Sequence, residues 1–344
     1  MGTRSGLDSQ AGFKNETTVG TEVVSDHFLE YDNEDFTEVP TWLENEGLRA
    51  GRKYKRDSRV GIVRYDVNGK LDVKVPTKGL GLLIKHMIAS AGTPVQIGAT
   101  TAYQQIHTPG DHVGKGLTVQ IGRPEASTGT VRPHTYRGCK CTQWELSVSD
   151  GDPLKLSTTW DGWRENTAAG LATASYASGA GIFNFSHATA KLGGTPSTGG
   201  SPSQLSVAGG VAIATVVNSI TIRGENPMAT ERFGVGNAGV KSEQLENDYP
   251  TVTGSFDAEF SKVELYDVFK AGTSVAFQLS FSTGDAGSSN PFLLDLIIPK
   301  IRFKTAPPSV DGPGIVRMSV DWEMYDDEVN APYQIKLVST DTAL

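Results

Sequence analysis

Short stretches in which apolar and polar residues alternate recur along the chain, and two of them open on a glycine. Residues 70–75 alternate after Gly69, and residues 255–260 alternate in the same way after Gly254. Alternation with a period of two is typical of a half-buried β-strand. A segment with apolar residues at helical spacing follows each stretch, over residues 78–91 and 262–271. The pattern predicts the same strand-then-helix unit twice.

The parallel between the two copies continues on both sides of this unit. Each predicted helix is followed by a strand, over residues 116–122 and 274–282, and each copy closes on a strand that carries a tryptophan, Trp160 or Trp322. Long polar loops, residues 37–59 and 225–249, precede the two opening strands. The extra length of the first copy falls in a predicted loop, residues 92–114, rich in Gly, Thr and Gln. This order predicts a duplication, although two unrelated β-sandwiches could share it by chance.

We therefore predict a mainly β protein with two tandem antiparallel β-sandwich domains, each with one flanking α-helix and a long loop. Residues 193–203 consist only of Gly, Ser, Pro and Thr, a composition typical of a mobile loop or linker. The predicted domains are residues 1–180, with an N-terminal arm and the long charged loop, and residues 181–344, which carry this Gly/Ser/Pro/Thr-rich loop.

Composition narrows the possible functions. The 344 residues carry a net charge of -8, whereas proteins that grip nucleic acid through phosphates usually present a large basic surface. No apolar run approaches the ~20 residues that span a bilayer, and no apolar secretory segment occurs near the N-terminus. We expect a soluble protein with no membrane partner. Cys139 and Cys141, two apart on a predicted strand, are expected to be buried free thiols.

Charge is segregated near the N-terminus. Residues 22–46 contain nine acidic residues and neither Lys nor Arg. Six basic residues follow: Arg49, Arg52, Lys53, Lys55, Arg56 and Arg59. These charges could belong to a solvated loop, or to a two-sided surface through which identical copies stack head to tail. A loop that binds nucleic acid is a third interpretation, which the adjoining acidic block disfavours.

No catalytic, cofactor or metal motif emerges from the sequence. The histidines are scattered, and neither a metalloprotease helix, a phosphate-binding loop nor a nucleophile elbow occurs. We therefore expect no enzymatic activity, no cofactor and no metal. The strands instead have a polar second face with an acidic bias, on which alternation places Glu145, Asp257, Glu259, Asp321 and Glu323. Such a face could simply contact water, or it could line a channel for a polyanion.

Short segments in order along nearly the whole chain carry a family resemblance. They include Lys-Asn-Glu-Thr-Thr-Val-Gly-Thr at 14–21, Glu-Gly-Leu-Arg-Ala-Gly-Arg at 46–52, and the segments 28–30, 75–83, 108–111, 116–124, 136–140, 144–147, 249–260, 265–269 and 308–313. Together they resemble the tail tube proteins of long-tailed bacteriophages with non-contractile tails, especially those of actinobacterial hosts. An inner tube of a contractile tail stays open as an alternative.

The resemblance implies tail-tube-type β-sandwich domains whose inner sheets join into a barrel around a lumen, and long loops that contact the next ring. The inter-ring loop would be residues 37–59, with its basic residues Arg49, Arg52, Lys53, Lys55, Arg56 and Arg59 as contacts. The lumen-facing candidates are Asp72, Glu145, Asp257, Glu259, Asp321 and Glu323. Because one chain holds two predicted domains, three chains should form a pseudo-six-fold ring, with six chains per ring as the alternative.

The implied protein is a structural part of the virion tail, assembled in the host bacterial cytoplasm. Its partners would be other copies of itself and the tail terminator, tape measure and distal tail proteins, with viral DNA passing through without specific binding. A capsid decoration protein, a head-tail connector and a carbohydrate-binding β-sandwich are the competing interpretations.

Overall fold

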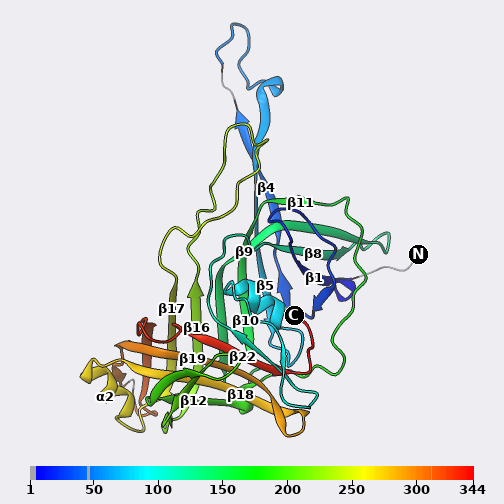
Figure 1. The fold of residues 1–344 in the computed structure, drawn as a ribbon. Coiled ribbons are helices and arrows are strands. Elements are labelled where there is room, and N and C mark those ends of the chain that lie inside the picture. Colours follow the sequence, from blue (N-terminus) through cyan, green and yellow to red (C-terminus); the bar gives the residue numbers. More distant parts are fainter. Residues whose placement is uncertain (1–4, 45–46, 311) are drawn as a thin grey trace.

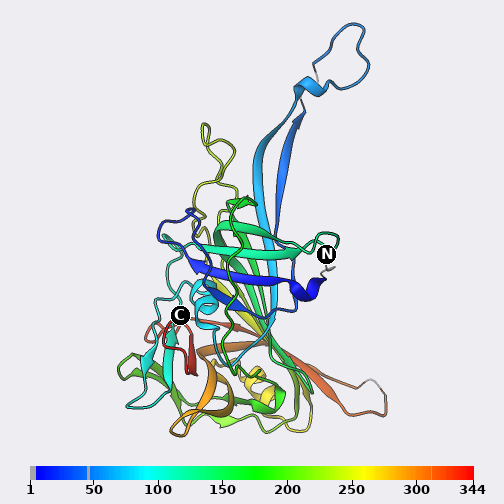
Figure 2. The same ribbon diagram turned by 90° about the vertical axis from the view of Figure 1, so that its right-hand side faces the viewer.

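The computed structural model describes residues 5–44, 47–310 and 312–344. The fold is mainly β, with antiparallel strands, which confirms the predicted fold class at that level. Figures 1 and 2 show a body of crossing sheets from which one long hairpin projects at one end.

The elements of the first half of the chain surround one short helix. They are β1 (Gln10–Asn15), β2 (His27–Leu29), β3 (Asn33–Glu34), β4 (Thr37–Glu44), β5 (Val60–Lys74), α1 (Gly81–Met87), β6 (Val95–Gln96), β7 (Tyr103–His107), β8 (Leu117–Pro124), β9 (Val131–Ser149), β10 (Lys155–Gly162) and β11 (Arg164–Asn166). The 3-10 turns Gly6–Asp8 and Asp57–Arg59 lie before β1 and β5.

The second half has a similar order of elements around its own helix, with an additional hairpin. A 3-10 turn, Phe185–His187, leads into β12 (Ala188–Leu192), β13 (Thr195–Gly199), β14 (Gln204–Ala208), β15 (Val211–Ala212), β16 (Val217–Glu225), β17 (Thr251–Glu259), α2 (Glu264–Ala271), β18 (Val275–Gly287), β19 (Asn290–Thr305), β20 (Pro308–Ser309), β21 (Arg317–Met324) and β22 (Gln334–Ser339). Hairpin β13–β14 pairs only with itself among the described strands.

One long sheet runs through both halves in the strand order β4–β5–β10–β9–β16–β17–β21–β19, with β3 beside β4 on β5. Strands β9 and β19 are long enough to leave this sheet and enter a second layer. The first half adds β2–β1–β8–β9–β11, and the second adds β15–β12–β18–β19–β22–β7–β6. Apolar side chains from both halves fill a single continuous core between these layers.

The two halves share pairing order and local register. Gly69 lies opposite Trp160, and Gly254 lies opposite Trp322. Beside each tryptophan the neighbouring strand carries one extra residue, Thr142 in β9 and Lys304 in β19. These Gly and Trp residues are the ones that relate the two predicted copies in the sequence analysis. Division into two domains near residue 180 stays a prediction, because β9 pairs with β16 and joins the halves in one sheet.

The glycines in these pairs are required by packing. A Cβ on Gly254 would lie 2.2 Å from a ring carbon of Trp322, and one on Gly69 would lie 2.2 Å from the ring of Phe36. Both tryptophans are buried. Any side chain at either glycine would displace a large aromatic ring from the core.

Helices and loops depart from the sequence prediction in four places, the first of which is residues 37–59: expected to be a loop, they begin with strand β4. Helix α1 covers only part of residues 78–91. Residues 92–114, expected to be a loop, contain β7, which pairs with β22 of the second half. Residues 193–203, expected to be a mobile linker, lie in hairpin β13–β14 instead. Pairing with the distant strand β22 decides β7, and local composition does not reveal it. Hairpin β13–β14 forms by local pairing between residues 195–199 and 204–208. Cys139 and Cys141 are buried free thiols, as predicted.

Candidate functional site

The solvent face of the long sheet brings together all six lumen candidates. Cross-strand partners place Asp72, Ser157, Glu145, Arg223, Thr253 and Glu323 in one row across the sheet. Asp257, Glu259 and Asp321 lie on the same face, since the residues between them in the strands, such as Phe256 and Val320, are buried. Alternation therefore assigned the two faces of these strands correctly.

This face also carries basic side chains that the sequence analysis did not include. They are Lys70, Lys74, Lys155, Arg223, Arg302, Lys304 and Arg317. Alternation within the same strands could have identified them. The face is therefore less acidic than the six candidates alone indicate.

Several of these charges are paired across neighbouring strands or along one strand. Glu145 accepts a hydrogen bond from Arg223 Nε at 2.5 Å, and Lys70 lies 3.2 Å from Asp72. Lys304 Nζ lies 2.7 Å from Glu323. Hydrogen bonds from Lys304 and from Tyr325 lower the pKa of Glu323 below its ordinary value. Asp72, Glu145 and Glu323 are thus paired with cations, whereas within the described residues Asp257, Glu259 and Asp321 have no ion pair.

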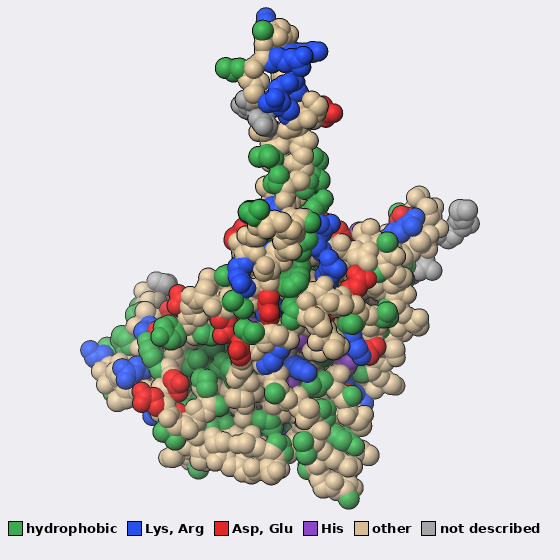
Figure 3. All heavy atoms as spheres, turned by 45° about the horizontal axis from the view of Figure 1, so that its top comes forward, with side chains coloured by type: hydrophobic (Ala, Val, Ile, Leu, Met, Phe, Trp, Pro, Cys, Tyr) green, Lys and Arg blue, Asp and Glu red, His purple; other side chains and the backbone are tan. Residues whose placement is uncertain are grey.

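Strands β4 and β5 continue beyond the long sheet as a two-stranded arm, defined here as residues 37–44 and 47–65. The basic residues predicted for the inter-ring loop gather at its tip, where Figure 3 shows a cluster of blue side chains. Among the described residues, Lys55 forms an ion pair with Glu44, and Arg49, Arg52, Lys53, Arg56 and Arg59 form none. The tip therefore carries positive charge that is exposed to solvent.

The stalk of the arm is apolar and exposed. Trp42 and Ile62 lie opposite each other across the hairpin, and Trp42 is 57% and Leu43 55% exposed. Val39, Val60 and Val63 are exposed along the same stalk. The sequence analysis classed residues 37–59 by their charge and missed this feature. A run of apolar residues beside charged ones was the available signal. Exposed apolar surface of this kind marks an interaction site.

The second long loop, residues 226–250, folds back onto the base of the arm. The backbone N–H of Tyr65 donates to Gly239 O at 3.2 Å. Arg64 forms an ion pair with Glu231 at 2.9 Å, and its guanidinium lies 4.7 Å from the centre of the Phe233 ring. The loop therefore supports the arm where it leaves the body.

A buried polar network anchors this loop to the body. Lys241, 1% exposed, donates to Asp161 Oδ1 at 2.6 Å, and Gln244 Nε2 donates to Asp161 Oδ2 at 2.7 Å. Nearby, Lys140 Nζ lies 2.7 Å from Glu243. Burial raises the pKa of Asp161 and lowers that of Lys140. Each buried charge in the network has a partner, which is the arrangement a structural anchor needs.

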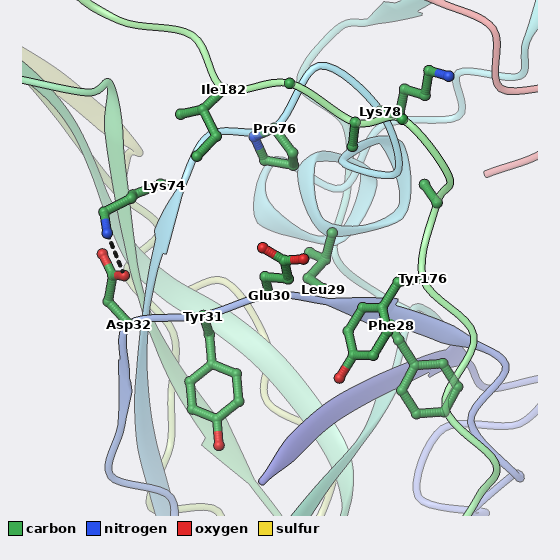
Figure 4. A pocket seen from close by; sticks show the side chains of 14 residues that line it. Phe28, Leu29, Glu30, Tyr31, Asp32, Lys74, Pro76, Lys78, Tyr176 and Ile182 are labelled. Carbon is green, nitrogen blue, oxygen red and sulfur yellow. Dashed lines mark ion pairs between the residues drawn. The ribbon is translucent and has the colours of Figure 1, made fainter. Parts of the chain in front are cut away.

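A hollow lies near β2, beside the edge of the sheet (Figure 4). It is lined by residues 28–32 and 176–182, with Lys74, Pro76 and Lys78. Lys74 and Asp32 form an ion pair of 3.0 Å across it. Among its described side chains no hydrogen bond joins a nucleophile to a base. The N–H of Asp32 donates to Asp72 O, so the hollow borders the outer edge of the long sheet.

The described residues offer neither a metal site nor a membrane-spanning helix. Within the described residues, no group of three or more His, Cys, Asp or Glu side chains is arranged to hold a metal ion. Burial lowers the pKa of His86 to about 3 and those of His107 and His112 to about 4. None of the helices in the described part of the chain is both long enough and apolar enough to traverse a bilayer.

Comparison with known proteins decides the family. The sequence profile of a family described as phage tail tube protein matches residues 6–324. The chain belongs to the phage tail tube protein family. The resemblance seen in the sequence is thereby confirmed over nearly the whole chain, and the tail tube protein is a structural component of the virion tail that self-assembles and contacts other tail proteins. No curated protein matches the chain.

Proposed function

We propose that three copies of this tail tube protein close into a ring lined by the solvent face of the long sheet, and that rings stack into the conduit for viral DNA. The observation that carries the proposal is the pairing of β9 with β16. This contact already joins two sets of four strands, β4–β5–β10–β9 and β16–β17–β21–β19, edge to edge within one chain. The two strand sets have the same pairing order. A ring needs only the same joint between chains.

The two ends of the long sheet provide the edges for that joint. In the pairing order, β3 and β4 correspond to β16. Strands β3 and β4 pair with β5 in the first half, just as β16 pairs with β17, the strand equivalent to β5, in the second half. Residues 305–309 correspond to the part of β9 that pairs with β16. Within the described residues, β3 and β4 pair only with β5, and residues 305–309 pair only with β21. Both edges are open to a second copy.

Register can be carried from the inner joint to the outer one. Glu225 of β16 lies opposite Gln143 of β9, and the equivalent pair between chains is Val39 with Thr305. Pro307 and Pro308 lack N–H donors, so we expect fewer backbone hydrogen bonds here than between β9 and β16. Three such joints and three inner joints would close six strand sets into one barrel.

The proposed lumen wall suits the passage of DNA. Its cations are largely paired with Asp or Glu, which leaves few of them to bind phosphates, and the chain as a whole has a charge of -8. DNA would therefore move along the wall without tight contacts. Assembly in the host cytoplasm, and contacts with the tail terminator, tape measure and distal tail proteins, complete the proposal.

A pair of cysteines tests the joint between chains. In the variant Val39→Cys/Thr305→Cys, oxidation should link three chains into a closed ring, because directly opposed strand residues are close enough for a disulfide. Val39→Cys/Val329→Cys, with a second cysteine on another exposed loop position, is the matched control. Equal cross-linking in both variants, or closed rings of six linked chains, would contradict the proposal.

A further inference from the structure

We propose that helix α2 is a contact surface between the chains of one ring. It would pack against the first half of a second copy, just as α1 packs against the second half of its own chain. This inference rests on the proposed ring and adds a contact behind the joint between the sheet edges. Figure 1 shows α2 at the end of the second half that lies farthest from the first half, so the first half of the same chain cannot cover it.

Helix α1 is covered by the second half of its own chain. Three side chains at helical spacing, at the start of α1 and along it, are each 2% exposed: Leu80, Ile84 and Met87. Around a small core cavity they meet apolar residues of β19 and β22, namely Leu294, Leu296 and Ile335. The joint between β9 and β16 is thus backed by a helix of one half that packs against the other half.

Helix α2 offers the corresponding side without a cover. When the starts of the two helices are aligned, Val263, Asp267 and Lys270 correspond to the three covered residues of α1. Val263 is 55% exposed, and Asp267 and Lys270 are exposed as well. Within the described part of the chain, neither Asp267 nor Lys270 forms an ion pair. The equivalent side of α2 is therefore exposed and charged.

Register identifies the surface of a second copy that would cover α2. Strands β8 and β9 pair as β18 and β19 do, and each pair is irregular at the same point, between Leu117 and Val119 or between Val275 and Phe277. Counting from this point, Arg132 and His134 of β9 correspond to the two leucines of β19 that cover α1.

This surface of the first half is charged and partly exposed. Arg132, whose side chain is 58% exposed, lies 2.7 Å from Glu125, and His134 Nδ1 lies 2.7 Å from Glu165. The backbone N–H of Glu165 donates to the carboxylate of Glu38 in β4. The surface therefore adjoins the edge strand at which the proposed joint between chains forms.

The charges of the two surfaces complement each other. Asp267 of α2 would face Arg132 of the second copy, and Lys270 would face the carboxylates of Glu125 and Glu165. Apolar side chains suit the permanent contact inside one chain, whereas charged ones keep the same surface from being a large exposed apolar patch before assembly. Complementary charge also sets the orientation in which two copies meet.

Mixed single-cysteine chains test this contact. Rings formed from equal amounts of Asp267→Cys and Arg132→Cys chains, treated with a short bis-maleimide, should give cross-linked dimers that contain one chain of each kind. The native thiols do not interfere, because Cys139 and Cys141 are buried. Asp267→Cys mixed with Val235→Cys, an exposed position on the loop of residues 226–250, is the control. Cross-links to Val235→Cys as frequent as those to Arg132→Cys would overturn the proposal.

Charge reversal gives a second readout. Asp267→Lys should lower the fraction of protein in closed rings by about tenfold, and Arg132→Glu in the same chain should restore part of it. Asp248→Lys, which reverses an exposed carboxylate elsewhere, is the matched control and should close rings normally.

The two proposals fail in different ways. Unchanged ring closure in Asp267→Lys would overturn the contact through α2 while the proposed ring stands. Failure of the unmodified chain to close rings, with Val39→Cys/Thr305→Cys unlinked as well, would instead refute the proposed ring, and the contact through α2 with it.

Discussion

Two long segments take the same place in the two halves of the molecule, yet one projects as a hairpin and the other packs against the base of that hairpin. The arm continues the pairing of β4 with β5 beyond the sheet, so its backbone hydrogen bonds are satisfied without the body. Residues 226–250 have only isolated bridges and are held by side chains such as Lys241 and Gln244. A hairpin that pairs with itself can leave the surface, whereas a loop without such pairing needs buried anchors.

The contrast also explains how the two segments divide their work. The folded segment presents its anchoring charges Lys241 and Glu243 inward, where Asp161 and Lys140 of the body pair with them. The arm presents apolar and basic side chains outward, where only another molecule can cover them. The two halves thus differ in what they carry, a loop that supports the base of the arm in one and the projecting arm in the other.

The largest expected effect comes from the anchor of the folded segment. Lys241→Met leaves Asp161 buried without its cation, so the free energy of unfolding should fall by about 3–5 kcal/mol. Urea denaturation measures the loss, and cleavage of residues 226–250 by a protease should become faster. The exposed tip variant Lys53→Met should change stability by less than ~0.5 kcal/mol. Equal stability of the two variants would refute the anchoring role.

The next effect tests the glycine and tryptophan pairs that relate the halves. Gly254→Ala and Gly69→Ala should each lower the free energy of unfolding by about 1–3 kcal/mol, because the added Cβ meets an aromatic ring. Gly61→Ala in the arm, where a Cβ meets nothing within 4 Å, is the matched control. If only one of the core variants is destabilised, the packing of the halves is not equivalent.

Acid should weaken the body through its buried histidines. His86, His107 and His112 have folded pKa values of about 3 to 4, below the value of about 6.5 in an unfolded chain. The unfolded state therefore binds more protons between these values, and stability present above pH 6.5 is lost as the pH falls towards 4. When the free energy of unfolding is measured against pH in this range, its slope should be smaller for His86→Gln than for the unmodified chain by about one proton. An unchanged slope would contradict the buried, neutral state.

The smallest effect on stability, and a large one on assembly, is expected in the arm. Trp42→Ser should change the free energy of unfolding by less than ~0.5 kcal/mol, because the side chain is mostly exposed. Sedimentation should nevertheless show far less protein in tubes than for the unmodified chain. Destabilisation comparable to that of Lys241→Met would mean that the arm packs against its own body.

Much of the local order was predictable from the sequence. Alternation placed Asp257 and Asp321 on the solvent face, and the Gly and Trp positions of the two copies form cross-strand pairs. The sequence could not predict that β7 pairs with β22, because that pairing depends on contacts between distant parts of the chain. The arm could not be predicted, because sequence analysis assigns apolar residues to the core, whereas the apolar residues of the arm are exposed. Exposed apolar surface of this kind marks an interaction site.

Mass per unit length of assembled tubes, measured by electron microscopy together with the axial ring spacing, tests the central claim most directly. The account predicts three chains of 36.7 kDa in each ring, each contributing two strand sets to one barrel. Six chains per ring would contradict it, since they would bring twelve strand sets to a barrel that the account closes with six.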